Sequence, residues 1–126
     1  MTLPHTRSIP LQLERKHKSY SACLVIAKEY PHLEDADKLL HQKEVEYFDT
    51  SKSEKRKKSI LLGKLVAKEA LRNEFPEVDY LGIDIQKGVF EHPVIYTPFV
   101  HNTQVTISHS VHYGASIAFP EEHPMG

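Results

Sequence analysis

A long amphipathic helix, expected over residues 53–75, constrains the fold of this chain more than any other feature. Its apolar side chains recur every three to four residues and form one wide stripe, made of Ile60, Leu61, Leu62, Leu65, Val66, Ala67, Ala70 and Leu71. Pro76 ends the helix, because proline disfavours a helical residue before it. Gly63 in mid-helix costs about 1 kcal/mol relative to alanine, which suggests close approach by a neighbouring element or a ligand. The stripe must be buried against another layer of the protein.

The remaining segments predict a sheet that can cover this helix. A first helix is expected over residues 33–48, and a Thr50 or Ser51 cap together with Glu54 would begin the long helix. Apolar and β-branched segments predict strands at residues 21–28, 80–86, 94–96, 104–108 and 114–119. This order indicates an α+β fold in which two helices pack on a mainly antiparallel sheet.

The composition is that of a single globular domain. The chain has 126 residues, of which 40% are hydrophobic and 26% are charged, and its net charge is −1. This near-neutral charge argues against general binding of nucleic acid or membranes. Cys23 is the single cysteine, and neither end resembles a signal peptide. We therefore expect a cytoplasmic protein with an extended N-terminal arm over residues 1–18 and one folded unit over residues 19–126.

Two features that could suggest a metal site are better explained in other ways. No cysteine or HExxH pattern supports zinc binding by the candidate histidines, which are His101, His109, His112 and His123. The sequence LGIDIQ at residues 81–86 contains Asp84, but it fits an ordinary strand. We expect no metal ligand at either place.

Residues 105–110, with the sequence VTISHS, place Ser108 and His109 near the end of an expected strand. A rigid strand fixes the direction of a hydroxyl and an imidazole, which suits binding of an anion or a phosphate ester. The same residues also fit a polar hairpin edge without a binding function.

Basic residues gather where the long helix begins, at Lys55, Arg56, Lys57 and Lys58. The run fits a solvated helix face. It also fits a phosphate clamp, because a helix N-terminus offers free amides and the positive end of the dipole. Cations are unfavourable at this end unless a negative ligand binds there. Nucleic-acid binding is a third alternative, but it would need more basic surface and exposed aromatic residues.

The turn at residues 90–93, with the sequence FEHP, also has two interpretations. Pro93 can be a turn device with His92 at the surface. Alternatively, the face of the proline stacks on a purine and His92 lies close to a phosphate.

Four segments, in this order, resemble the N-terminal half of a 4′-phosphopantetheinyl transferase of the two-lobed, surfactin-synthetase-activating type. Residues 54–71 resemble the basic segment and long helix of that family, and residues 88–94 resemble its glycine–proline turn. Residues 105–110 resemble its Ser-His-Ser strand, and residues 114–126 resemble the strand that leads to its metal motif. The resemblance implies that residues 19–126 form one lobe of the phosphopantetheinyl transferase fold.

Members of this family transfer the phosphopantetheine arm of coenzyme A to a serine of an acyl or peptidyl carrier protein, with Mg²⁺ on the pyrophosphate. They serve fatty acid, polyketide or nonribosomal peptide biosynthesis. The resemblance implies coenzyme A binding by Lys55, Arg56, Lys57, His92, Pro93, Ser108 and His109. The basic residues and the Ser-His pair would face phosphates, and the His-Pro pair would face the adenine and 3′-phosphate end. His92 departs from the family, which usually has Lys or Arg there.

The larger departure from the family is the absence of the acidic residues that bind its metal ion. There, a metal motif follows the strand after Ser-His-Ser, and the second lobe supplies another glutamate and a lysine. The sequence stops at Gly126, before these residues, so we expect it to contain no catalytic residue and no Mg²⁺ ligand. A second lobe, or self-association through an exposed edge, would then complete the enzyme. The alternative is a non-catalytic module that binds coenzyme A or a partner.

Overall fold

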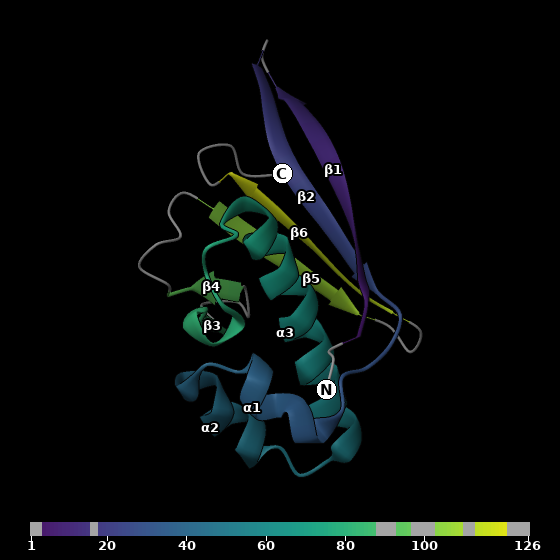
Figure 1. Ribbon diagram of the computed structural model, residues 1–126, viewed down its shortest axis with the longest axis vertical. Helices are drawn as coiled ribbons and strands as arrows, with labels where there is room; N and C mark the ends of the chain where they lie inside the picture. Colours follow the sequence, from purple (N-terminus) through teal and green to yellow (C-terminus); the bar gives the residue numbers. More distant parts are fainter. Residues whose placement is uncertain (1–3, 16–17, 88–92, 97–102, 110–112, 121–126) are drawn as a thin grey trace.

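The computed structural model describes residues 4–15, 18–87, 93–96, 103–109 and 113–120. The N-terminal half contains strands β1 (Thr6–Arg15) and β2 (Lys18–Ala27), the 3₁₀ turn η1 (Leu33–Asp35), and helices α1 (Ala36–Leu39), α2 (Gln42–Thr50) and α3 (Glu54–Glu74). The 3₁₀ turn η2 (Tyr80–Gly82) and strands β3 (Ile85–Lys87), β4 (Pro93–Ile95), β5 (Thr103–His109) and β6 (Gly114–Pro120) follow, as Figure 1 shows.

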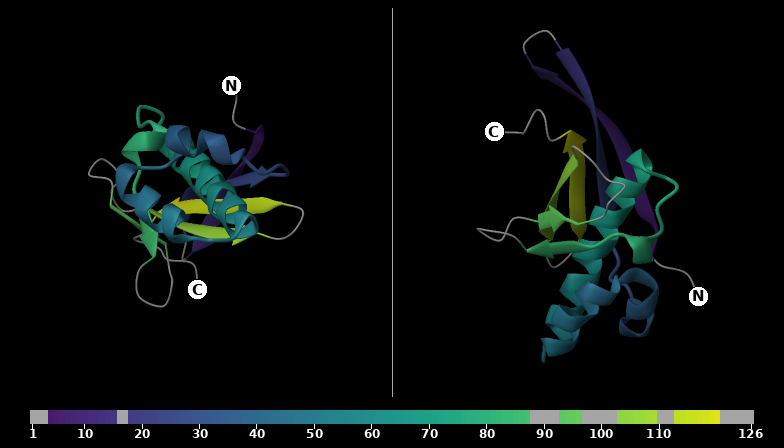
Figure 2. Two further views of the ribbon diagram at one scale, coloured as in Figure 1. Left: turned by 90° about the horizontal axis from the view of Figure 1, so that it is seen from below. Right: turned by 90° about the vertical axis from the view of Figure 1, so that its left-hand side faces the viewer.

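The main sheet has four antiparallel strands in the order β1-β2-β6-β5. Strands β3 and β4 form a separate two-stranded antiparallel ribbon beside it. Helix α3 lies across one face of the main sheet and contacts β2, β5 and β6 (Figure 1 and Figure 2). The predicted α+β fold, with helices packed on a mainly antiparallel sheet, is confirmed.

The core lies between α3 and the sheet, as the apolar stripe predicts. The stripe residues that are fully buried are Leu61, Leu62, Leu65, Val66, Ala67, Ala70 and Leu71. They belong to the same apolar cluster as Val25, Val105 and Ala118 from the sheet. Burial of these side chains supplies the main driving force for folding. Ile60 is the exception, because it is only half-buried at the edge of the core.

The first predicted helix is divided in two, so α3 is preceded by α1 and α2. Leu40 is extended, with φ −92° and ψ 132°, and His41 caps the N-terminus of α2. The His41 Nδ1 atom accepts a hydrogen bond from the Lys43 amide at 3.0 Å, and the Glu44 carboxylate accepts one from the His41 amide at 2.7 Å. Histidine is an unusual residue at this position, which is why sequence signals did not reveal the break.

The start of α3 also differs from the expectation. The cap is Ser53, whose Oγ accepts a hydrogen bond from the Arg56 amide at 3.3 Å, and not Thr50 or Ser51. Thr50 instead belongs to α2, where its hydroxyl donates to the Tyr47 carbonyl.

Two other segments differ in detail from the sequence analysis. Residues 80–86, predicted as one strand, begin with the 3₁₀ turn η2 before β3. The Tyr80 carbonyl accepts hydrogen bonds from the Ile83 amide and from the buried Lys68 ammonium, so it is diverted from strand pairing. The expected N-terminal arm contributes β1, which pairs with β2 from Thr6 opposite Ala27 to Arg15 opposite Lys18.

Two glycines allow the helix and the sheet to approach closely. A Cβ atom added to Gly63 would lie 3.1 Å from Ile107 Cγ2, so the close approach predicted at Gly63 is confirmed and the neighbour is β5. A Cβ atom added to Gly114 would lie 2.7 Å from Leu62 Cγ. Because Leu62 is fully buried in α3, it has little room to move.

Gly114→Ala should therefore destabilise the protein by about 1–3 kcal/mol, as expected when a methyl group is forced into a packed core. Gly82→Ala is the matched control, because among the described residues its added Cβ atom would meet only Val78 Cγ1, at an ordinary 3.7 Å. The control should change stability by no more than about 0.5 kcal/mol. Urea unfolding of both variants measures the difference, and equal stability of the two would contradict this account of the packing.

Candidate functional site

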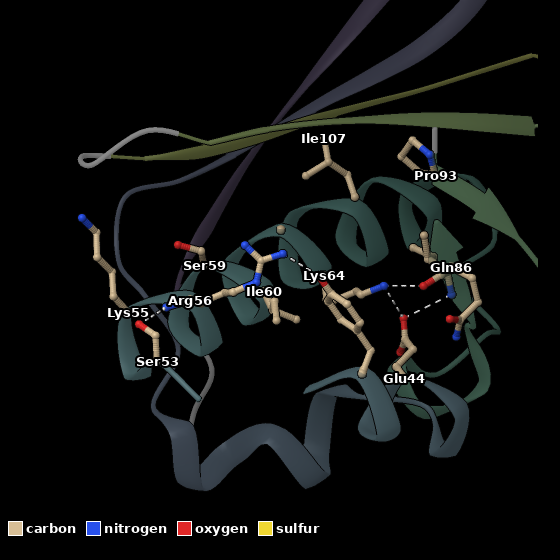
Figure 3. Close-up of a pocket in the computed structure, with 13 residues that line it drawn as sticks. Glu44, Ser53, Lys55, Arg56, Ser59, Ile60, Lys64, Gln86, Pro93 and Ile107 are labelled. Carbon is tan, nitrogen blue, oxygen red and sulfur yellow. Dashed lines mark hydrogen bonds and ion pairs between the residues drawn. The ribbon is translucent and has the colours of Figure 1, made fainter. Parts of the chain in front are cut away.

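A pocket of about 950 Å³ opens between helices α2 and α3, the β3–β4 ribbon and strand β5 (Figure 3). Helix α3 contributes most of the lining, and Ile107 of β5 covers it from the sheet side. The lining residues are Glu44, Tyr47, Ser53, Lys55, Arg56, Ser59, Ile60, Gly63, Lys64, Ile85, Gln86, Pro93 and Ile107.

Three cationic side chains of α3 line this pocket: Lys55, Arg56 and Lys64. Arg56 and Lys64 are eight residues apart, which places them on the same face of the helix two turns apart. The Arg56 guanidinium donates a hydrogen bond to Tyr47 Oη at 2.6 Å and lies 6.0 Å from the centre of the Tyr47 ring. Figure 3 shows Arg56 and Lys64 in the middle of the pocket and Lys55 at the far end.

A buried charged cluster forms the floor of the pocket. Glu44 is 2% exposed and Lys68 is fully buried, and their side chains form an ion pair. Lys68 Nζ also donates to the carbonyls of Leu39 at 2.7 Å and Tyr80 at 3.0 Å. The second carboxylate oxygen of Glu44 lies 3.1 Å from Lys64 Nζ. Two lysines therefore share one carboxylate, which leaves the cluster with one net positive charge while both lysines are protonated.

The environment of Lys68 lowers its pKa. Burial disfavours the charged ammonium and lowers the pKa of Lys68 to about 8, while the charge and hydrogen bond of Glu44 act in the opposite direction. At neutral pH Lys68 is therefore still mostly protonated. The positive charge that the cluster presents to the pocket is at Lys64, whose side chain is 17% exposed.

The structure brings together three of the residues predicted to bind coenzyme A, namely Lys55, Arg56 and Pro93. Lys57 turns away from the pocket, and its ammonium lies 5.2 Å from the centre of the Phe48 ring. Ser108 is exposed on β5. Because side chains alternate along a strand and Ile107 faces α3, Ser108 points to the opposite face of the sheet.

The two predicted histidines cannot be placed in the same way. His92 lies outside the described residues. His109 ends β5, where it pairs with Gly114, but its side chain is outside the described part. The roles of Ser108, His92 and His109 stay predictions.

Three residues of the pocket and its floor were not predicted from the sequence: Lys64, Glu44 and Lys68. A signal for Lys64 was available, because Arg56, Ile60 and Lys64 follow each other at intervals of four residues along one helix face. Glu44 and Lys68 gave no comparable signal, since they are 24 residues apart and belong to different helices.

The described part of the chain offers no metal site. No group of three or more His, Cys, Asp or Glu residues within it could hold a metal ion. Asp84 is buried, and its carboxylate accepts a hydrogen bond from Gln86 Nε2 at 2.5 Å. We therefore assign no Mg²⁺ ligand among the described residues. None of the described helices has the length and apolar character needed to cross a membrane.

Comparisons with known proteins identify the fold. No protein-family model and no curated protein match the chain. A holo-(acyl-carrier-protein) synthase from Bacillus anthracis strain Ames, solved in complex with CoA (3′,5′-ADP), is 20% identical with a TM-score of 0.68, over 79% of this chain and 93% of that one. The holo-ACP synthase of Plasmodium yoelii is 18% identical with a TM-score of 0.62, over 71% and 78% of the two chains. The chain therefore has the single-lobe fold of these synthases.

The lowered pKa of Lys68 predicts how stability changes with pH. The unfolded chain has an ordinary lysine pKa of 10.5, above the folded value of about 8, so the unfolded state binds the proton more tightly. The contribution of Lys68 to stability should therefore rise between about pH 8 and pH 10.5, by about 2 kcal/mol from pH 7.5 to pH 9.5.

Urea unfolding of the wild type and of Lys68→Met at these two pH values tests this expectation. The variant should lose the alkaline rise, because methionine fills a similar volume but does not titrate. Lys58→Met is the control, since the Lys58 side chain is exposed and forms an ion pair with the exposed Glu54, and it should keep the rise. A rise that persists in Lys68→Met would contradict this role of Lys68.

Proposed function

We propose that the chain binds coenzyme A in this pocket, with the phosphates of the ligand against the cations of α3. The observation that carries the proposal is that Lys55, Arg56 and Lys64 all line one cavity, with Arg56 and Lys64 in its middle. Clustered cations in a concave site attract a ligand with several negative charges. The likeness of the fold to a synthase solved with CoA supports the same ligand.

The first turn of α3 supplies the strongest anion-binding chemistry. Lys55 and Arg56 lie where the helix begins, next to the positive end of the helix dipole. The guanidinium of Arg56 carries five N–H donors, so it can bind a phosphate while one donor holds Tyr47. The cations of this turn, unfavourable for the helix alone, are explained by an anionic ligand.

The apolar part of the pocket suits the nucleoside end of coenzyme A. Ile60, Ile107 and the ring of Pro93 line the cavity near the cations. Apolar walls with a few charged groups are typical of cofactor sites. We propose that Pro93 and His92 bind the adenine and 3′-phosphate end, and that His109 contacts a phosphate in the bound state. Lys57 and Ser108, whose side chains lie away from the pocket, are given no role in it.

We further propose that the chain takes part in transfer of phosphopantetheine to a serine of an acyl or peptidyl carrier protein. The serine hydroxyl would lose its proton to solvent as its oxygen forms a bond to phosphorus, the pyrophosphate bond would break, and 3′,5′-ADP would leave. Such a reaction depends on positioning and on stabilisation of the phosphate charge, which Arg56 and Lys64 would provide. A second lobe or a second chain would supply the acidic groups that the resemblance implies.

Charge-removing variants test coenzyme A binding. In calorimetric titrations at constant salt, Arg56→Ala and Lys64→Ala should each weaken coenzyme A binding by about tenfold, because each removes a charged hydrogen-bond donor. Lys58→Ala removes one positive charge from the same helix outside the pocket, and should change affinity by less than about twofold. Equal losses in all three variants would show that only the overall charge matters and would contradict a defined site.

A transfer assay tests the reaction. The chain alone, mixed with coenzyme A, Mg²⁺ and an apo carrier protein, should produce little holo carrier protein by mass spectrometry. Efficient transfer would contradict the need for a second lobe. Binding of coenzyme A without transfer, even after the candidate second lobe is added, would favour a non-catalytic binding module.

A further inference from the structure

A carboxylate lies at the floor of a pocket whose other charged side chains are cations. Glu44 belongs to the first turn of α2, and its side chain is 1% exposed. One of its oxygens accepts from the His41 amide at 2.7 Å and pairs with Lys68. The other accepts from the Ile85 amide at 3.1 Å and lies 3.1 Å from Lys64 Nζ. Both oxygens of Glu44 are therefore held in place by α2, α3 and β3.

The lysines on either side of Glu44 differ in what they can reach. Lys68 is fully buried, and its ammonium is bound to Glu44 and two backbone carbonyls. Lys64 lines the pocket, and its ammonium is bound to Glu44 and the Ile85 carbonyl (Figure 3). Lys68 thus holds the Glu44 carboxylate from the buried side of the pocket floor, and the carboxylate in turn holds the Lys64 ammonium, which faces the pocket.

Attraction of an anionic ligand does not explain why the Glu44 carboxylate lies at the floor of this pocket. A negative group at the floor repels an anionic ligand, and burial of Glu44 carries a desolvation cost that its lysine partners must offset. A lysine side chain, in contrast, has many rotamers, and fixing it costs about 2 kcal/mol of entropy when a ligand binds. A partner that fixes the side chain beforehand removes this cost from ligand binding.

We propose that Glu44 is a positioning residue, which holds the Lys64 ammonium at the pocket floor in the place where an anionic phosphate binds. The proposal rests on the proposed binding of coenzyme A. Glu44 itself need not touch the ligand. It acts through Lys64, and the Lys68 ammonium keeps its carboxylate in place.

Positioning and simple electrostatics predict opposite effects of Glu44→Gln. Removal of a negative charge from the pocket should strengthen coenzyme A binding if charge alone matters. If Glu44 positions Lys64, the variant should bind coenzyme A about tenfold more weakly. Glu46→Gln is the matched control, because Glu46 is exposed on the same helix and does not line the pocket. Glu44→Asp keeps the charge but shortens the side chain, so it should also weaken binding, and it serves if the glutamine variant does not fold.

A double-mutant cycle shows whether the effect passes through Lys64. In a Lys64→Met background, Glu44→Gln should weaken coenzyme A binding much less than it does in the wild type, because only the part of the loss that passes through Lys64 is then absent. A loss of similar size in both backgrounds would overturn the proposal, because Glu44 would then only maintain the shape of the pocket. Unchanged or tighter binding by the single variant would also overturn it.

A measurement without ligand separates this proposal from the proposed function. NMR of the Lys64 Cε protons in the wild type should show two distinct signals, as expected for a fixed side chain, and these should merge in Glu44→Gln. Merged signals in the wild type would overturn the positioning role even if coenzyme A binds. If the wild type binds no coenzyme A, the proposed function fails, and the claim that Glu44 serves a ligand site fails with it.

Discussion

The buried ion pair between Glu44 and Lys68 is the interaction on which the pocket depends. Charges removed from water must be paired and hydrogen-bonded, and these two satisfy that requirement only when several segments meet at one point. The acceptors for Lys68 come from the end of α1 at Leu39 and from η2 at Tyr80. Glu44 in turn binds the Ile85 amide of β3. The pair thus fixes the elements around the pocket relative to α3, whether or not it adds net stability.

Helix α3 has two roles on different sides of its surface. Its apolar stripe packs on the sheet and supplies most of the core. A second face carries Arg56 and Lys64 into the pocket and Lys68 beneath it. Because one rigid helix carries both faces, packing of the core fixes the backbone positions from which the cationic side chains extend. The contact between Gly63 and Ile107 brings β5 close enough to close the pocket on the sheet side.

The sequence predicted the features that depend on repeating patterns. The apolar stripe of α3, the α+β fold and the close approach at Gly63 are confirmed, because each leaves a local or periodic signal. The basic start of α3 gave two residues that line the pocket, Lys55 and Arg56.

The remaining parts of the site depend on contacts that no local pattern records. The pairing of Glu44 with Lys68 joins two helices, and each residue alone looks like an ordinary surface charge. The break before α2 depends on His41 as a cap, and η2 depends on Lys68 binding the Tyr80 carbonyl. Both departures from the predicted elements are therefore consequences of tertiary contacts around the pocket.

The most direct test of the central claim, that the cationic pocket on α3 binds coenzyme A, is an NMR titration of the ¹⁵N-labelled protein. Coenzyme A should shift the amide signals of the first turn of α3, Gly63, Lys64 and Ile107, and these shifts should saturate together. Residues on the opposite face of the sheet, such as Thr106, should change little. Shifts confined to that opposite face, or no saturable shifts at all, would contradict the account.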